Sequence, residues 1–189
     1  IKDIESLAPS CVYNPEFLRE QHADDDFINS KLLVFGGCDE SSISAAGIYK
    51  KYTKCIYSDY VFTDLISASF IKYSINSFLS TKVIFFNELY KLFSKSGSNE
   101  TWENFILALS KDSRLGDSHM QVPGHDGRFG FGGACLPKDS NAFSIYSDEI
   151  GEPLNLLKKV IKTNNKIRAT YNNETERELE QNIKFNGEN

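Results

Sequence analysis

The chain has 189 residues, of which 40% are hydrophobic and 25% charged, and its formal net charge is -5. This length suffices for one compact domain or one and a half, and the acidic balance without a basic patch excludes nucleic acid as the main partner. No apolar run reaches the roughly 18 residues of a membrane span, and the first residues do not form a signal peptide. The four cysteines are scattered and only three histidines are present, so we expect reduced thiols, a cytoplasmic protein and no metal site.

The first 61 residues alternate between strand-like and helical patterns. Residues 10–13 and 31–37 indicate strands, residues 42–52 a helix, and residues 54–58 a further strand. This alternation is typical of an α/β fold and predicts the carboxyl-terminal part of a Rossmann-like parallel sheet. No GxGxxG sequence follows a strand anywhere in the chain, so the usual dinucleotide-binding fingerprint is not found.

From Thr63 the hydrophobic period changes to three and four residues, and it continues to Ser94 without Pro or Gly. A helix of about 30 residues would be about 45 Å long, and its broad apolar surface needs a partner. We expect it to pair with a second copy of the chain; a core helix of a monomer is the alternative. Shorter helices are expected over residues 101–110, 139–146 and 153–168, and residues beyond 170 are weakly patterned.

Residues 130–139 read Gly-Phe-Gly-Gly-Ala-Cys-Leu-Pro-Lys-Asp. Glycines let the backbone approach a bound molecule, and a thiol is a nucleophile as its thiolate, which a nearby ammonium or a helix amino terminus stabilises. Cys135 with Lys138 and Asp139 therefore suggests covalent catalysis on a small substrate. A glycine turn with a buried structural cysteine and a solvated Lys-Asp pair is the alternative interpretation.

Two other segments favour the catalytic interpretation. Residues 14–20, Asn-Pro-Glu-Phe-Leu-Arg-Glu, resemble the Pro-Glu-Phe-Leu-x-Glu element of the UDP-glucose and GDP-mannose dehydrogenases, and residues 71–88 resemble the helix of that family that carries a lysine and an asparagine. Residues 130–139 are similar to the family's cysteine segment, in the form typical of the UDP-glucose branch. The three elements follow the family's order and approximate spacing, over residues 10–168.

The resemblance implies a fragment of a nucleotide-sugar 6-dehydrogenase. Such an enzyme uses NAD to oxidise UDP-glucose to UDP-glucuronate in two steps, through a thiohemiacetal and a thioester on a cysteine. Cys135 matches that cysteine. Lys72 and Asn76, one helical turn apart, match the groups that stabilise the oxyanion. A solvated lysine and an amide that bonds a neighbouring helix are the alternative for this pair.

Three carboxylates match acidic groups of the family. Asp139 would position or deprotonate the water that hydrolyses the thioester, Glu16 would be a second acid/base group, and Glu20 would contact the substrate and the lysine. Without the resemblance, Glu16 and Glu20 could equally be solvated residues at the start of a helix.

Further positions match the family's ligand contacts less closely. Lys138 matches a cofactor-contacting position, although most of the NAD site would lie outside this sequence. The segment between Gly116 and Gly130 is longer than in the common family form, and His125 and Arg128 are either phosphate contacts or ordinary loop residues. The expected substrate contacts are Phe17, Leu18, Arg19, Val122, Pro123, Gly124 and Gly132.

The resemblance also predicts the domain organisation. Residues 1–61 would be the carboxyl-terminal part of an NAD-binding domain, residues 62–170 a helical dimerisation domain, and residues 171–189 the stub of a UDP-binding domain. Because the phosphate-binding GxGxxG loop is not found, we expect the chain by itself to be inactive. The alternative function is a truncated, catalytically idle dimerisation module of the same family. The expected partners are a UDP-sugar and a second copy, with neither nucleic acid nor a membrane.

Overall fold

A computed structural model describes residues 8, 10–19, 22–55 and 59–186. The chain divides into two compact units, Ile1–Ser74 and Ile75–Asn189. The division lies within the long helix α4 (Leu65–Phe93), so this helix contributes its first residues to one unit and its remainder to the other.

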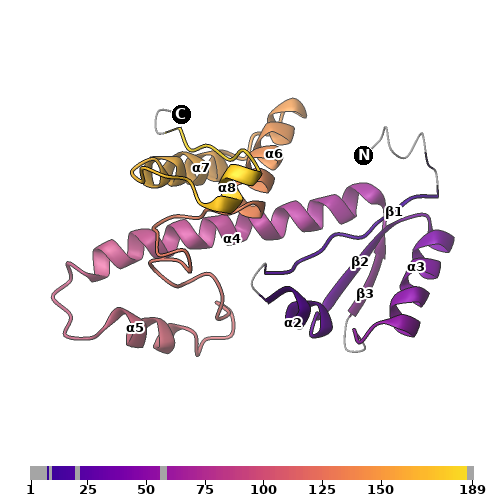
Figure 1. The fold of residues 1–189 in the computed structure, drawn as a ribbon, viewed down its shortest axis with the longest axis horizontal. Coiled ribbons are helices and arrows are strands. Elements are labelled where there is room, and N and C mark those ends of the chain that lie inside the picture. Colours follow the sequence, from indigo (N-terminus) through magenta and orange to yellow (C-terminus); the bar gives the residue numbers. More distant parts are fainter. Residues whose placement is uncertain (1–7, 9, 20–21, 56–58, 187–189) are drawn as a thin grey trace. The chain divides into compact units, whose positions relative to one another are not determined.

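The first unit is built on a three-stranded sheet in the order β1-β2-β3, as Figure 1 shows. Strands β2 (Leu32–Gly37) and β3 (Asp59–Thr63) are parallel, and the crossover between them contains α3 (Asp39–Tyr52). The core between sheet and helix consists of Leu33, Phe35, Ala46 and Cys55. Large apolar residues occupy the first four positions of β2, and aromatic and β-branched residues make up most of β3, as is typical of strands in a βαβ unit. The α/β expectation is met in this unit.

The expectation of an all-parallel sheet is wrong at its edge. Strand β1 (Val12–Tyr13) pairs antiparallel with β2, with Val12 opposite Gly37. A parallel partner would require a crossover that covers a face of the sheet, whereas α2 (Ala23–Ile28), the helix between β1 and β2, has six residues. Antiparallel edge strands on otherwise parallel sheets are common.

The strand expected at residues 54–58 is also misplaced. Residues 56–58 lie outside the described part of the chain, Lys54 and Cys55 are not in a strand, and β3 begins at Asp59. Cys55 instead points into the core, where its thiol donates to the carbonyl oxygen of Phe27 at 2.9 Å. The residues that follow, with aromatic side chains at the alternate positions Tyr60 and Phe62, carry the pattern of a strand.

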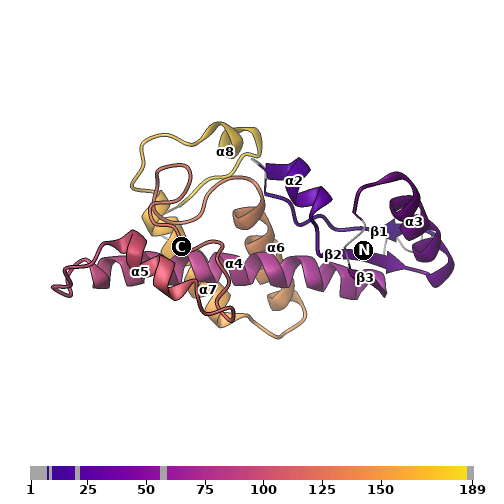
Figure 2. The same cartoon turned by 90° about the horizontal axis from the view of Figure 1, so that it is seen from below.

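The second unit is helical. It contains the carboxyl-terminal part of α4 together with α5 (Trp102–Leu109), α6 (Cys135–Glu149), α7 (Asn155–Arg168) and α8 (Glu176–Glu180). Helices α6 and α7 lie on one side of α4 and α5 on the other (Figure 1, Figure 2). Each side has its own apolar cluster. Phe86, Trp102, Met120 and Val122 form the cluster toward α5, and Ile84, Phe131 and Val160 form the cluster toward α6 and α7.

Two helices of this unit differ from the sequence expectation. Helix α6 begins at Cys135, earlier than the expected start at Asp139, because Pro137 is tolerated in a first turn, where the backbone N–H groups have no intrahelical partner. Beyond Thr170 the sequence predicts a weakly ordered stub. The structure instead forms α8, whose capping box joins Thr175 and Glu178, and Glu178 is buried.

Close packing of β2 against the start of α4 yields a first prediction. A Cβ atom added to Gly36 would lie 2.4 Å from the Cβ of Ala68 and 3.0 Å from the carbonyl oxygen of Asp64. Gly36→Ala should therefore lower the free energy of unfolding by about 1–3 kcal/mol, the usual cost of overpacking. Urea denaturation of the whole chain measures this change in the free energy of unfolding.

Gly47→Ala is the matched control. Gly47 lies in α3 with nothing within 4 Å of an added Cβ, so this change should stabilise the chain by about 0.5–1 kcal/mol. Equal effects of the two substitutions would contradict the packing argument.

Candidate active site

In the first unit, Lys72 is bonded to the segment that resembles the Pro-Glu-Phe-Leu element. Its ammonium group donates to the backbone carbonyl of Glu16, and it lies 3.1 Å from one Glu16 carboxylate oxygen. The ring centroid of Phe17 is 5.5 Å from the same nitrogen, within range of a cation–π contact. Lys72 is buried whereas the Glu16 side chain is half exposed. The structure therefore brings these two predicted residues into direct contact.

The same segment is fixed by hydrogen bonds to its own backbone. The Glu16 carboxylate accepts from the N–H of Leu18 at 2.8 Å, and Asp26 of α2 accepts from the N–H of Arg19 at 2.8 Å. Asp26 also accepts from Arg19 Nε and Nη2, at 3.0 and 2.7 Å. The N–H groups of Leu18 and Arg19 are therefore occupied, and the carbonyl oxygen of Arg19 accepts from the N–H of His22 at 2.9 Å. Glu20 lies outside the described residues.

In the second unit, Asn76 and Asp139 are in direct contact. The Asn76 amide donates to a carboxylate oxygen of Asp139 at 2.5 Å, and both side chains are buried. Beside this contact, the hydroxyl oxygens of Ser80, one turn after Asn76, and Ser140, the residue after Asp139, are 2.8 Å apart. These small buried side chains let α4 and α6 approach closely, so the predicted amide and carboxylate meet.

Cys135 is the first residue of α6, and it is free and exposed. Gly130 and Gly133 precede it with φ of 77° and 73°, the left-handed region in which glycine is favoured. The Lys138 side chain is 59% exposed, and its ammonium group is 3.8 Å from Asp139. Cys135 and Asp139 are one helical turn apart, which brings the thiol-bearing residue and the buried carboxylate onto one face of α6.

The remaining expected substrate contacts lie in the loop before Cys135. Val122 is buried in the aromatic cluster with Phe86 and Trp102, so its backbone is the part that can meet a ligand. Pro123 is exposed, and the N–H of Gly124 donates to the carbonyl oxygen of Arg128 at 2.8 Å. The backbone of Gly132 lies against the side chains of Arg168 and Glu178, where an added Cβ would be 2.3 Å from each.

The turn at residues 112–116, which precedes this loop, is held by a buried lysine. Lys82 of α4 donates to the carbonyl oxygen of Leu115 at 2.9 Å. Burial lowers the pKa of Lys82 below its ordinary value, and Asp117 acts in the opposite direction. Arg114 in this turn is exposed and paired with Asp112.

Several polar residues around this loop were not predicted from the sequence. They are Asn87, Asp126, Asn164, Arg168, Tyr171 and Glu178. Asn87 lies within the helix segment of residues 71–88, but no spacing distinguishes it, Asp126, Asn164, Arg168 or Tyr171 from solvated polar residues. Glu178 alone had a local signal, because Thr175 three residues earlier completes the capping-box pattern.

The structure thus pairs Glu16 with Lys72 in one unit and Asn76 with Asp139 in the other. Lys72 belongs to the first unit and Cys135 to the second, so their convergence stays a prediction. Lys138, a cation at the first turn of a helix, fits a contact with an anionic cofactor such as a dinucleotide.

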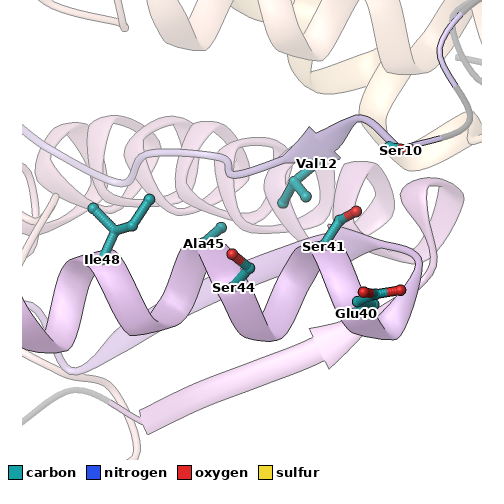
Figure 3. Close-up of a pocket in the computed structure, with 7 residues that line it drawn as sticks. All are labelled: Ser10, Val12, Glu40, Ser41, Ser44, Ala45 and Ile48. Atoms are coloured by element: carbon teal, nitrogen blue, oxygen red, sulfur yellow. The ribbon is translucent and has the colours of Figure 1, made fainter.

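A pocket of about 480 Å³ lies in the first unit, away from these residues. Figure 3 shows it between Val12 of β1 and the side of α3 that carries Ser41, Ser44 and Ile48. None of the expected catalytic residues lines it. Within the described ranges, no three His, Cys, Asp or Glu side chains are grouped to hold a metal ion. No helix in the part of the chain that the structure describes is long and apolar enough to cross a membrane.

Asp26 provides a test of how the segment before Glu20 is held. The bond from the Arg19 side chain lowers the pKa of Asp26 to about 2, against the desolvation that raises it. Because this pKa is depressed, the stabilising contact is complete above the unfolded value of about 3.9 and is lost as the pH falls through about 2. Asp26→Asn should therefore speed exchange of the Arg19 amide hydrogen several-fold at neutral pH, as measured by NMR. Asp24→Asn, an exposed change in the same helix, should leave that rate unaltered, and equal effects would contradict the assignment.

Comparison with known proteins identifies the family. The central domain of the UDP-glucose/GDP-mannose dehydrogenase family matches residues 66–166. UDP-glucose 6-dehydrogenase YwqF of Bacillus subtilis is 34% identical over 166 residues, which are 87% of this chain and 35% of that protein. A UDP-glucose 6-dehydrogenase of Rickettsia conorii is 37% identical over 155 residues, 80% of this chain and 33% of the relative. The chain therefore spans about a third of the length of these relatives.

Solved structures agree. A UDP-glucose dehydrogenase of Pyrobaculum islandicum superposes with a TM-score of 0.67 at 31% identity, over 81% of this chain and 33% of that one. A UDP-D-ManNAc dehydrogenase of Pyrococcus horikoshii, 20% identical, shares the fold with a TM-score of 0.66 over 84% of this chain and 34% of that one. Since the family's central domain matches more than half of the sequence, the chain belongs to the UDP-glucose/GDP-mannose dehydrogenase family.

Proposed function

We propose that this chain carries the catalytic residues of an NAD-dependent UDP-glucose 6-dehydrogenase, which oxidises the primary alcohol at carbon 6 to a carboxylate. The observation that carries the proposal is the bond between Asn76 and Asp139, one helical turn from Cys135. A buried carboxylate paired with a helix amide beside an exposed thiol is a set of groups suited to acyl chemistry on a cysteine. Family membership and the names of the relatives supply the substrate class.

Cys135 would keep the intermediate aldehyde bound. Its sulfur adds to the aldehyde carbon, the carbonyl oxygen takes up a proton, and a thiohemiacetal results. Loss of a hydride from carbon and a proton from oxygen turns this adduct into a thioester. Water then adds, the carbon–sulfur bond breaks, and the carboxylate leaves while the sulfur recovers its thiol. Two hydrides depart from carbon 6 in total, the first when the alcohol becomes the aldehyde and the second when the thiohemiacetal becomes the thioester, and two molecules of NAD would supply the two acceptors.

Lys72 and Asn76 would stabilise the oxygen on carbon 6. They lie one turn apart on α4, and side chains at this spacing project to the same side of a helix. The ammonium and the amide are both donors, so they favour the negative charge that develops on oxygen when water or sulfur adds to the carbon. Removing one such donor typically reduces kcat by about 100- to 1,000-fold.

The carboxylates would handle protons and water. Asp139 is placed by Asn76, and its second oxygen, 3.8 Å from the Lys138 ammonium group, would orient the hydrolytic water. Glu16, paired with Lys72, would be a second acid/base group, and Glu20 would contact the substrate near that lysine. Glu16 already holds Lys72 through both its carboxylate and its backbone carbonyl, so it also positions the ammonium.

The remaining expected contacts would bind the two ligands. Lys138 would touch the cofactor, because its side chain is exposed at the start of α6. A reducing compartment such as the cytoplasm would suit a nucleophilic Cys135, since all four cysteines are free. Substrate contacts are assigned, largely through the backbone, to Phe17, Leu18, Arg19, Val122, Pro123, Gly124 and Gly132.

The cysteine assignment is tested by alkylation. The chain is treated with iodoacetamide with and without the 6-aldehyde of UDP-glucose, and modification of each cysteine is followed by mass spectrometry. The aldehyde should slow labelling of Cys135 about tenfold or more, because the sulfur is engaged in the adduct. Cys38, also exposed, is the internal control and should react equally in both samples.

Asn76→Ala should weaken this protection, because the amide both donates to the developing oxyanion and places Asp139. Unchanged labelling of Cys135 at saturating aldehyde would remove it from the proposed role.

We also propose that the chain forms a homodimer through α4. Phe78, Phe85 and Leu92 are 67%, 58% and 68% exposed and recur at seven-residue intervals, so they lie on one face of the helix. An exposed apolar row of this length is typical of an interface between protein chains.

Phe85→Glu should convert the dimer to a monomer, because it places a charge in the apolar row. Light scattering coupled to size exclusion at micromolar concentration gives the mass. Lys111→Glu, which adds the same side chain at an exposed position outside that row, should remain dimeric. A wild-type chain that is monomeric under these conditions refutes the proposal.

A further inference from the structure

The loop that leads to Cys135 is held by side chains from other parts of its unit. We call residues 126–134 the cysteine loop. The N–H of Gly130 donates to the Asn87 side chain at 2.9 Å. Phe131 exchanges two bonds with the Asn164 amide, at 2.7 and 2.9 Å. The loop belongs to no helix or strand, so these side chains take the place of the backbone partners that regular structure would provide.

Arg168, at the end of α7, packs against the backbone of this loop. Its guanidinium donates to Asp126 at 2.7 Å and to Glu178 at 2.5 Å, and the Arg168 and Glu178 side chains are each 1% exposed. An added Cβ on Gly132 would be 2.3 Å from Arg168 Nη2 and 2.3 Å from Glu178 Oε1. The loop backbone therefore rests directly on the ion pair, and position 132 has no room for a side chain.

Glu178 is itself fixed within its short helix. Its second carboxylate oxygen accepts from the N–H of Thr175 at 2.7 Å, and Arg128 Nη1 lies 3.9 Å from that oxygen. Burial raises the pKa of Glu178, but the Thr175 bond and the charge of Arg168 outweigh burial, and the net effect lowers it. The carboxylate is therefore ionised at neutral pH and pairs with Arg168 as an anion.

Among the described side chains, the charges of this cluster are balanced, and the buried Nε of Arg168 has no hydrogen-bond partner. Two guanidinium groups, Arg128 and Arg168, face two carboxylates, Asp126 and Glu178. Arg128 also donates to the carbonyl oxygen of Asn173 at 2.6 Å. An anionic ligand would have to displace an internal carboxylate, so the cluster is suited to holding the chain rather than binding a substrate phosphate.

We propose that Arg168 and Glu178 are positioning residues for Cys135. Their buried ion pair packs against the backbone of the cysteine loop and fixes it. Residues 175–178, which hold Glu178, therefore help to position the candidate active site. A buried ion pair adds little net stability compared with apolar packing, but removing one partner leaves an uncompensated charge. The planar fork of an arginine also sets orientation, because it bonds Asp126 and Glu178 at the same time.

This inference rests on the proposed function for its catalytic meaning, but its structural part can be tested separately. Amide hydrogen exchange of the whole chain is measured at neutral pH for Glu178→Gln and Arg168→Lys. We expect exchange at Gly130, Phe131 and Gly132 to rise at least about tenfold in both variants, because each leaves a buried group without its matched partner. Amides in the α4 part of the second unit should keep their wild-type rates.

Matched variants distinguish positioning from general destabilisation. Glu176→Gln removes the same charge from an exposed position in α8 and should change nothing. Thr175→Ala keeps the ion pair but removes the cap on Glu178, and should give a smaller rise confined to the loop. A uniform rise over all amides of the unit in Glu178→Gln would indicate loss of stability alone and overturn the proposal, as would unchanged exchange in both Arg168→Lys and Glu178→Gln.

The alkylation assay then reports on function. In Glu178→Gln, aldehyde protection of Cys135 should fall by about tenfold relative to wild type while Cys38 is unaffected. If wild type shows no protection but exchange rises in the loop as expected, the proposed function fails and the positioning role stands. If wild type is protected and exchange is unchanged in the variants, the positioning role fails and the proposed function stands.

Discussion

The hydrogen bond between Asn76 and Asp139 is the contact on which the arrangement of the second unit depends. It joins α4 to α6, and it is buried on both sides. Breaking it would leave an ionisable group without a partner in a place where water has little access, which is costly. Ser80, one turn further along α4, and Ser140, next to Asp139, add a second contact between the helices through small hydroxyl groups. The two helices therefore have one register, and that register presents Cys135 and Asp139 on one face of α6.

Polar contacts also restrict the conformation of the loop that precedes Cys135. Glycines at 130 and 133 permit the backbone to turn, but they also cost conformational entropy and cannot pack. Asn164, Arg168 and Glu178 offset this loss by bonding the loop or lying against it. Glycine gives the loop its shape and the buried polar cluster restricts it to that shape.

In the first unit, too, the residues that shape the backbone differ from those that hold it through polar contacts. Gly36 shapes the backbone, whereas Lys72 and Asp26 hold the segment between Glu16 and Arg19 through charges. Gly36 lets α4 begin directly against β2, and the same helix then carries Lys72 to the carbonyl of Glu16. The proposed oxyanion donor is thus placed by close backbone packing and by a charged hydrogen bond together.

The sequence alone determined the family, the α/β and helical parts and the extent of α4 to within two residues at each end, and it proposed Lys72, Asn76, Cys135 and Asp139 as site residues. These depend on local periodicity and short motifs, which are readable along the chain. Tertiary structure decided the antiparallel β1, the start of α6 and the order of residues beyond Thr170. It also decided the burial of Arg168 and Glu178, because an ion pair between two polar segments produces no hydrophobic periodicity in the sequence. Which polar side chains become buried depends on what packs over them, and that is settled by the fold.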